Sequence, residues 1–359
     1  MNNETLNIDE STKIDKILLI NCEIAEIEWL EYLEELNIAK VNDNKQGYIT
    51  NSGQTFEYLK ITKNGCIDSL TAGVAYGKQY CTLQLSVNKG EIRNFEGNTV
   101  DEYMQQLADV QEFLKFEFGI LIDFSNAKLK SLEINRTFKI EYPFDEYSRA
   151  IQLILSQMPK MQKITTVTNL EQGKNETFAV WNKKECTAKS RSFKKIIFYD
   201  KGKQCETSVI LDSDYMRFEI KLFGTRNIKD NLKVKKFVNL TQEMVDTWFS
   251  KQVDTLIIKP LQKWQKTRNK LVKTILKEEL EKGGTWLINT LRRFTAYELE
   301  YKTPLILDIS EIYQIVDKLP VDDKSRVKSR FLQQSLKYER IFTNNDNSKL
   351  MEILNKLTI

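Results

Sequence analysis

The chain has 359 residues, of which 41% are hydrophobic and 29% charged, and its formal net charge is +4. This balance is typical of a globular protein with a substantial core, and the length suggests two or three domains of roughly 150 residues each. The sequence contains no apolar run of about 18 residues and begins without a signal-peptide pattern. We therefore expect a cytoplasmic protein that makes no membrane contact.

Histidine is absent from the whole sequence. This excludes Ser-His-Asp and Cys-His catalysis, HExxH zinc sites and, in their usual form, histidine-ligated HUH nucleases. The cysteines form no CxxC pair and show no regular spacing, which argues against a disulfide framework and a zinc site. They are Cys22, Cys66, Cys81, Cys186 and Cys205. A metal would have to be held by carboxylates and carbonyls, which suit Mg²⁺ or Mn²⁺.

Charge is distributed unevenly along the chain. Residues 1–40 hold ten acidic and three basic residues, whereas the segments 183–203, 259–277 and 324–340 are basic. The second of these segments contains seven Lys or Arg residues and no acid. Such clusters commonly bind polyphosphate, because each neutralised phosphate releases counterions. The alternative interpretation of any one cluster is a solvated basic helix face.

The first part of the chain favours strands. Residues 14–20 form an apolar strand-like run, and an acidic helical stretch follows around 27–36. Alternating apolar and polar residues predict further strands at 48–50, 56–61 and 79–87, with glycine-containing breaks between them.

The middle of the chain mixes helices and strands. Apolar residues recur at three- and four-residue steps over 99–116, which predicts a helix capped by Thr99 or Asp101. A second helix, 145–158, ends before Pro159. Strands are expected at 129–142 and again within 176–199 and 205–223, where the segments 193–199 and 215–222 are the clearest.

The C-terminal part is predicted to be helical. The expected helices cover 241–256, 261–282, 284–300, 309–318 and 323–341. The fold class is therefore α+β, with a mainly antiparallel sheet domain and a helical C-terminal domain. We place an acidic segment at 1–45, the α+β domain at 46–250 and the basic helical domain at 251–359.

Polar residues are aligned on two of the predicted strands. Side chains alternate with period two, so Arg217, Glu219 and Lys221 share one strand face. Glu133 and Asn135 share a face in the same way, together with Thr137. Faces of this kind either line a groove or are simply exposed to solvent.

The run SRSFKKIIFYDKGKQ (190–204), followed by YMRFEIKL (215–222), resembles rolling-circle replication initiators and relaxases. The similar groups are the Rep_trans-type plasmid initiators and the phage gene II-like replication proteins. Both show a basic segment ending in Tyr-x-Lys, then a strand of the Arg-x-Glu kind. The segment LEINRTFKIEYPFDEYSRAIQLI is also similar to the middle of the gene II-like group. The resemblance covers about residues 80–260 and departs from the gene II-like pattern at Asn88, where relatives often have histidine.

The resemblance implies a DNA-binding protein that nicks one strand at a replication origin and forms a 5′-phosphotyrosine. Tyr199 is then the nucleophile, and Arg217 and Lys201 clamp the phosphate. We expect the nearby ammonium to favour the phenolate, and Gly202 to set the phenol at the edge of the sheet. Three other tyrosines compete for the role: Tyr142, Tyr147 and Tyr215.

A divalent metal is expected to balance the charge that builds on the phosphate. The candidate ligands are Glu133 and Glu219, with Asn135 beside the former, and the ion is Mg²⁺ or Mn²⁺. Basic residues expected to contact DNA are Arg191, Lys194, Lys195, Lys263, Lys266, Arg268, Lys270, Arg292 and Arg293.

The expected partner is origin DNA, single- or double-stranded, and a homodimer and host replication proteins are further candidates. One alternative is a non-catalytic DNA-binding replication or regulatory protein of a mobile element. Another is a structural protein whose basic faces are only solvated.

Overall fold

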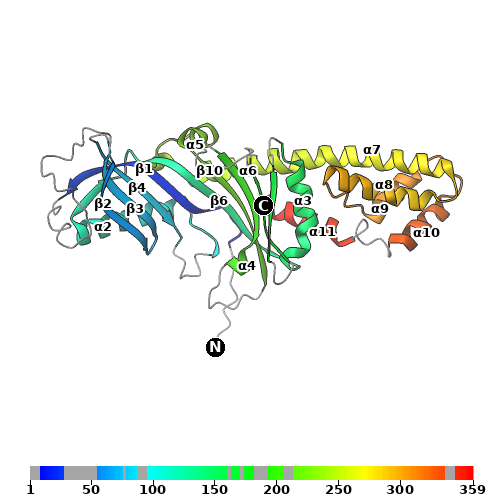
Figure 1. The fold of residues 1–359 in the computed structure, drawn as a ribbon, viewed down its shortest axis with the longest axis horizontal. Helices are drawn as coiled ribbons and strands as arrows, with labels where there is room; N and C mark the ends of the chain where they lie inside the picture. The colour runs from blue at the N-terminus through cyan, green and yellow to red at the C-terminus, as the bar shows by residue number, and fades with distance from the viewer. Residues whose placement is uncertain are drawn as a thin grey trace, which may run out of the picture.

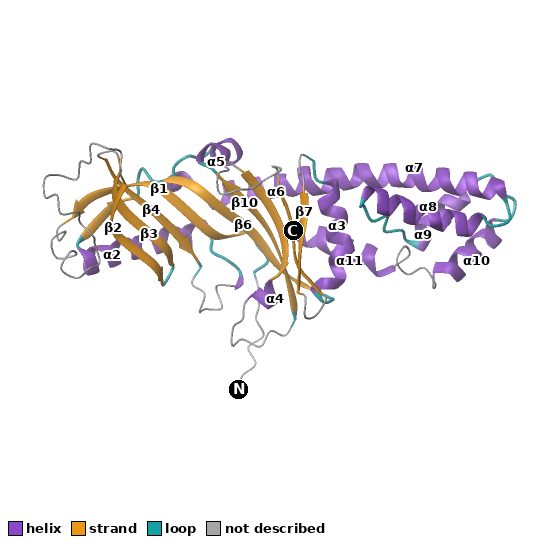
Figure 2. Cartoon of the chain, in the orientation of Figure 1, coloured by secondary structure: helices purple, strands orange, loops and turns teal. Residues whose placement is uncertain are grey.

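One antiparallel sheet, helices that lie against it and a helical arm that extends from one end of it make up the described part of the chain (Figures 1 and 2). The computed structural model describes residues 9–27, 55–75, 78–87, 95–159, 163–169, 174–181, 193–204, 213–335 and 344–358. The predicted α+β class is confirmed. No described helix is both long and apolar enough to cross a membrane.

The strands of the sheet follow the order β2-β3-β4-β1-β6-β10-β9-β8-β7, and β5 pairs with the far end of β1. Their bounds are β1 (Lys13–Ile27), β2 (Thr55–Asn64), β3 (Ile67–Ala75), β4 (Lys78–Ser86), β5 (Ile120–Asp123), β6 (Lys128–Ile140), β7 (Lys163–Asn169), β8 (Lys174–Trp181), β9 (Phe193–Asp200) and β10 (Asp214–Phe223). The clearest predicted strands therefore exist, whereas β5 and β7 were not predicted individually.

The helices also follow the predicted pattern in most places. They are α2 (Val100–Phe118), α3 (Ser148–Gln157), α4 (Lys201–Gln204), α5 (Thr225–Leu232), α6 (Gln242–Val253), α7 (Lys259–Lys282), α8 (Trp286–Tyr301), α9 (Ile309–Asp317), α10 (Lys324–Ser335) and α11 (Asn344–Thr358). Short 3₁₀ helices lie at η2 (Phe144–Tyr147) and η3 (Phe237–Asn239), and a π-helical segment, η4, covers Asp254–Ile258.

The start of α2 shows how the sequence fixes a helix end. Thr99, one of the two predicted caps, accepts a hydrogen bond from the Glu102 amide, and the Glu102 carboxylate accepts one from the Thr99 amide. This reciprocal capping box satisfies two amides that the first turn would leave unpaired. The expected helix at 27–36 and the expected strand at 48–50 lie outside the described residues, apart from Ile27 at the end of β1.

Strand alternation gives the middle of the sheet two different faces. On one face, the Phe198 and Phe218 rings lie 4.7 Å apart, and Phe218 meets Phe249 of α6. Arg136 shares this face and donates to the carbonyl of Leu357 in α11. Helices therefore cover this apolar face, and the opposite face carries the polar side chains described below.

A nearly continuous helix joins the sheet to the helical arm. α6, the π-helical segment η4 and α7 follow one another without a break over 242–282, about 60 Å at 1.5 Å per residue (Figure 1). Leu261 and Trp264 pack in the core that includes the sheet, and Val272 and Leu276 pack in a second core with α8, α9 and α10. α11 returns to the sheet, where Leu357 joins the first core.

The segment between α8 and α9 connects these two cores. Leu305 and Leu307 lie in the second core, but Ile306 between them lies in the first. Ile306 adopts a φ of +43°, a left-handed conformation that is costly for a β-branched residue. Tertiary contacts on both sides must therefore hold this residue in place.

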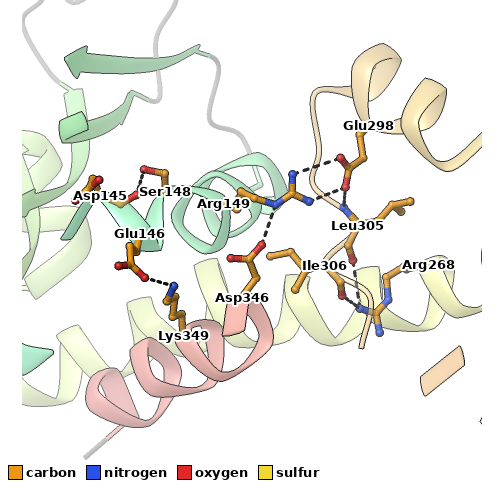
Figure 3. A network of polar contacts seen from close by, with 10 residues as sticks. All are labelled: Asp145, Glu146, Ser148, Arg149, Arg268, Glu298, Leu305, Ile306, Asp346 and Lys349. Atoms are coloured by element: carbon orange, nitrogen blue, oxygen red, sulfur yellow. Dashed lines mark hydrogen bonds and ion pairs between the residues drawn. The ribbon is translucent and has the colours of Figure 1, made fainter. Parts of the chain in front are cut away.

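A buried polar network holds the same junction together (Figure 3). Arg149 of α3 donates to Glu298 of α8 and to Asp346 of α11, each at 2.9 Å. Glu298 accepts from the Leu305 amide at 2.6 Å, and Arg268 of α7 donates to the Ile306 carbonyl at 2.7 Å. The network satisfies the backbone of the strained segment on both sides.

Replacing Arg268 should destabilise the protein strongly. Its side chain is 4% exposed and also pairs with Glu311 at 2.5 Å, so Arg268→Ala leaves a carboxylate and two carbonyls without their donor. We expect a loss of about 3 kcal/mol in the free energy of unfolding, measured by urea denaturation. The control is Lys270→Ala, two residues along on the exposed side of α7. Equal stabilities of the two variants would contradict this account of the junction.

Candidate metal and nucleophile site

Three carboxylates from neighbouring strands converge on the polar face of the sheet. One oxygen each from Asp15 of β1, Glu133 of β6 and Glu219 of β10 lies within 4.8 Å of the others. Glu133 and Glu219 are 8% and 5% exposed, so the cluster is mostly withdrawn from water. β6 lies between β1 and β10, and alternation turns Glu133 and Glu219 to the same side. The sequence analysis named these two but did not name Asp15 as a ligand.

Asp15 reaches the cluster because β1 is irregular at this point. The register between β1 and β6 shifts between Ile14 and Lys16, so Asp15 sits at a bulge. A bulge re-aims side chains, which a strict alternation pattern cannot predict. The available signal was an isolated acid inside an apolar strand, Lys13-Ile14-Asp15-Lys16-Ile17, where an unpaired carboxylate would be costly.

Asn135 is a buried amide beside this cluster, directly opposite Glu219 across the β6–β10 pair. It is fully buried, and neither its side-chain oxygen nor its nitrogen has a hydrogen-bond partner. The chain also approaches closely here, because a Cβ added at Gly97 would lie 3.0 Å from the Asn135 nitrogen. An orphaned buried amide next to three carboxylates points to a missing polar ligand.

The donor set fits a hard divalent cation. Carboxylate oxygens and a carboxamide oxygen are the ligands that Mg²⁺ and Mn²⁺ prefer. This acidic group of Asp15, Glu133 and Glu219 could therefore bind a metal, with Asn135 as a further oxygen donor.

Arg217 is the cation built into this face. Its guanidinium is completely buried and donates to Asp15 at 2.5 Å, to the Thr137 hydroxyl at 2.8 Å and to the Phe95 carbonyl. Burial opposes its charge, but Tyr199 and Asp15 raise the pKa of Arg217 above its ordinary value. The N–H groups of Arg217 are thus hydrogen-bonded within the protein and do not point freely toward a phosphate.

Tyr199 lies in the site but not at the edge of the sheet. It stands directly opposite Arg217 on β10 and Thr177 on β8, so strands flank it on both sides. Its side chain is 7% exposed, and its hydroxyl donates to a Glu219 oxygen at 3.3 Å. Tyr199 is the second-last residue of β9, just before the chain turns into α4 as expected, but β8 pairs beyond β9, so Tyr199 does not lie on an edge strand.

The buried position of Tyr199 opposes the expected phenolate, because burial disfavours the charged form. Burial is the largest cause that raises the pKa of Tyr199 well above 10, and it outweighs the lowering effect of Arg217. Lys201 is itself buried, and its charge acts on Asp15. Arg217 and Lys201 together hold the pKa of Asp15 below its ordinary value in spite of burial.

The carboxyl groups of the cluster differ in their cationic partners. Burial, followed by the charges of Glu133 and Asp15, raises the pKa of Glu219 to about 8. Glu133 forms an ion pair with Lys221, which stands opposite it in register. The acidic cluster therefore contains one carboxyl group, Glu219, that lacks an adequate cationic partner.

The rival tyrosines occupy other surroundings. The Tyr147 hydroxyl donates to Glu352 of α11, and Lys349 lies over the Tyr142 ring at 4.6 Å. Tyr215 is buried with its ring 4.8 Å from that of Phe95. Tyr103, which the sequence analysis did not single out, donates to the Asp15 carbonyl at 2.7 Å. Among the candidate tyrosines, Tyr199 is the one bonded to a carboxylate of the cluster.

The basic residues expected to contact DNA divide into exposed and internal groups. Lys263, Lys266 and Lys270 are exposed along α7, and Arg292 is exposed on α8. Arg293 pairs with Glu278 at 2.7 Å and Glu279 at 3.0 Å. Arg191 lies outside the described residues.

Two of the expected contacts are structural residues. Arg268 is buried at the junction, bonded to backbone carbonyls and Glu311, so it does not present its charge to DNA. Lys194 lies on the helix-covered face, where it donates to Gln252 at 2.7 Å and lies 5.5 Å from the Trp248 ring centroid. Lys195 lies on the acidic face, opposite Lys221.

No protein-family model and no curated protein matches the chain. Among solved structures, a rolling circle replication initiator protein from Geobacillus stearothermophilus matches with a TM-score of 0.32 and 11% identity, over 69% of this chain and 85% of that one. The di-domain ARO/CYC BexL from the BE-7585A biosynthetic pathway matches with a TM-score of 0.17 and 8% identity, over 64% of this chain and 92% of that one. Likenesses this weak do not identify a family.

The half-buried ammonium of Lys194 should make stability depend on pH. Burial lowers its pKa from 10.5 to about 8, so the unfolded chain holds more protons between these values. The contribution of Lys194 to the free energy of unfolding therefore falls as the pH drops from about 10.5 to 8, and it stays low at lower pH. We expect Lys194→Met to raise the melting temperature at pH 7, with a smaller gain near pH 10. A destabilised variant at pH 7, or a gain that grows toward pH 10, would contradict the assignment.

Removing one carboxylate should weaken metal binding. Glu219→Gln keeps the shape of the side chain but removes its charge, so we expect Mn²⁺ affinity, measured by isothermal titration calorimetry, to fall by roughly ten-fold or more. The control is Glu243→Gln on the exposed surface of α6. Unchanged Mn²⁺ binding by Glu219→Gln would show that the ion binds elsewhere.

Proposed function

We propose that the protein initiates rolling-circle DNA replication by nicking one DNA strand in a metal-dependent reaction, with Tyr199 as nucleophile. The observation that carries this proposal is the hydrogen bond from the Tyr199 hydroxyl to Glu219, a member of the buried three-carboxylate cluster. A phenol, a set of oxygen ligands for a metal and a buried guanidinium are thus side by side on neighbouring strands.

Nicking replaces one phosphodiester bond by another. The Tyr199 oxygen attacks the phosphorus, a tyrosyl P–O bond forms, and the bond to the 3′ oxygen breaks, leaving a free 3′ hydroxyl that takes its proton from solvent. Glu219 already accepts the hydrogen bond from the phenol, and in its ionised form it is placed to take the proton that the phenol loses. A divalent ion held by the carboxylates would stabilise negative charge on the phosphate.

Arg217 acts mainly as a positioning residue in this proposal. It fixes Asp15, lies opposite Tyr199, and has its donors engaged with Thr137 and the Phe95 carbonyl as well. Lys201, whose charge acts on Asp15, is a further cation near the cluster, in addition to the Lys221 that pairs with Glu133. Binding of the DNA phosphate in this proposal therefore depends more on the metal than on Arg217, whose guanidinium is already hydrogen-bonded within the protein.

A second candidate function is a DNA-binding replication or regulatory protein that keeps this site without nicking. The observation that favours it is the closed state of the site, because Tyr199 is 7% exposed and Arg217 is fully buried. The two functions differ in whether a covalent protein–DNA adduct forms.

Replacing the nucleophile should abolish the adduct without unfolding the protein. Tyr199→Phe removes one oxygen and little volume, so we expect no adduct and no nicking with Mn²⁺ and a supercoiled plasmid that carries the DNA surrounding the coding sequence. The readout is an SDS-resistant protein–DNA band. The matched control is Tyr215→Phe, a buried tyrosine two residues from Arg217 that should keep the activity.

An adduct formed by Tyr199→Phe would assign the nucleophile to another tyrosine. No adduct from the wild-type protein with either metal, on plasmid or single-stranded DNA, would favour the binding function instead.

A further inference from the structure

Six lysines form a stripe along the solvent side of α7. They are Lys259, Lys263, Lys266, Lys270, Lys273 and Lys277, and all are exposed. Their spacing alternates between four and three residues, so at about 100° per residue they fall within an arc of about 80°. The stripe is about 27 Å long at 1.5 Å per residue, and no acidic residue interrupts it.

The opposite side of α7 fixes the direction in which this lysine stripe points. Leu261, Trp264, Val272 and Leu276 are buried in the two cores, and Arg268 is bonded at the junction. α7 lies along the outer border of the helical arm, where it runs away from the sheet (Figure 1). The helix therefore presents its lysines on a rigid, outward-facing surface.

Most of the stripe is not neutralised by the protein. Lys259 pairs with Asp254 at 2.5 Å and Lys277 lies 3.9 Å from Glu281, at the two ends. Lys263, Lys266 and Lys270, and likewise Lys273, have no carboxylate within salt-bridge distance among the described residues. Like charges three and four residues apart destabilise a helix, so the stripe lowers stability unless a polyanion binds it.

We propose that the lysine stripe of α7 binds the phosphate backbone of duplex DNA. Its ammonium groups recur about every 5 Å along a straight helix, so the stripe presents a row of positive charge to the duplex surface, which carries one phosphate per roughly 3.4 Å of axis on each strand. Lysine ammonium groups bind phosphate as point charges and read no base edges, so this contact is independent of sequence. The inference extends the proposed function, because the arm would hold duplex DNA while the carboxylate site acts on one strand.

The test measures duplex binding separately from nicking. All proteins carry Tyr199→Phe, and fluorescence anisotropy with a labelled duplex oligonucleotide of arbitrary sequence gives the affinity at several KCl concentrations. The stripe variant combines Lys263→Gln, Lys266→Gln, Lys270→Gln and Lys273→Gln. The control combines Lys115→Gln, Lys229→Gln, Lys235→Gln and Lys318→Gln, which removes the same charge from exposed positions on separate parts of the fold.

The stripe variant should bind the duplex at least ten-fold more weakly at low salt, and the log–log salt slope should fall in magnitude by about 3 to 4. The control variant should lose less than about three-fold. Mn²⁺ affinity should be unchanged in both, so a failure of the carboxylate site is recognised separately.

Three results would overturn the proposal. The stripe variant could bind duplex DNA like the wild type, or the control could lose as much affinity, which would indicate net charge alone. The third result is wild-type binding to phosphatidylserine-containing vesicles with no binding to duplex DNA, which would assign the stripe to an acidic membrane surface. Circular dichroism melting curves establish that each variant is folded.

Discussion

The buried pairing of Arg217 with Asp15 is the interaction on which the polar face of the sheet depends. Three carboxylates gathered within a few ångströms repel one another, and burial strengthens that repulsion. A fully buried guanidinium bonded to Asp15 offsets part of this charge and stands directly beside Tyr199. Losing one partner of such a buried pair leaves an uncompensated charge, so the same contact supports both the fold and the site.

The helical arm depends on the sheet in a different way. One long helix runs from the sheet into the arm, and the strained Ile306 segment is held from both sides by Arg268 and by Glu298. Arg149 adds a contact from α3 to both the arm and α11. These buried polar contacts fix the orientation of α7, so its two sides have separate roles. One side packs on the cores, and the other presents lysines to solvent.

Much of the candidate site could be predicted from the sequence because strand periodicity is a local property. Alternation alone placed Glu219 and Arg217 on one face, and the basic strand ending in Tyr199 was recognisable as a unit. Asp15 could not be placed, because it depends on a bulge in β1 and on pairing with β6, more than a hundred residues away in the sequence. Alternation also predicts that Lys194 and Lys195 lie on opposite faces of the sheet. Tertiary packing decides which of these faces the helices cover, and the local sequence does not show it.

The same distinction applies to the helical region. The lysine run of α7 and its apolar side were both readable from the 3.6-residue period. Arg268 lies on the apolar side of that helix and was nevertheless grouped with the DNA contacts, although its position among Trp264 and Val272 already indicated burial. The return of α11 to the sheet has no local signal, because it depends on contacts with residues such as Arg136 that are distant in sequence.

The most direct test of the central claim is to locate the nucleotide on the protein after the reaction. The covalent adduct formed with Mn²⁺ is digested with nuclease and trypsin, and the peptides are sequenced by tandem mass spectrometry. Our account predicts a nucleotide on Tyr199, within the peptide spanning residues 196–201. A nucleotide on Tyr103, Tyr142, Tyr147 or Tyr215, or an adduct that forms equally well in EDTA, would contradict it.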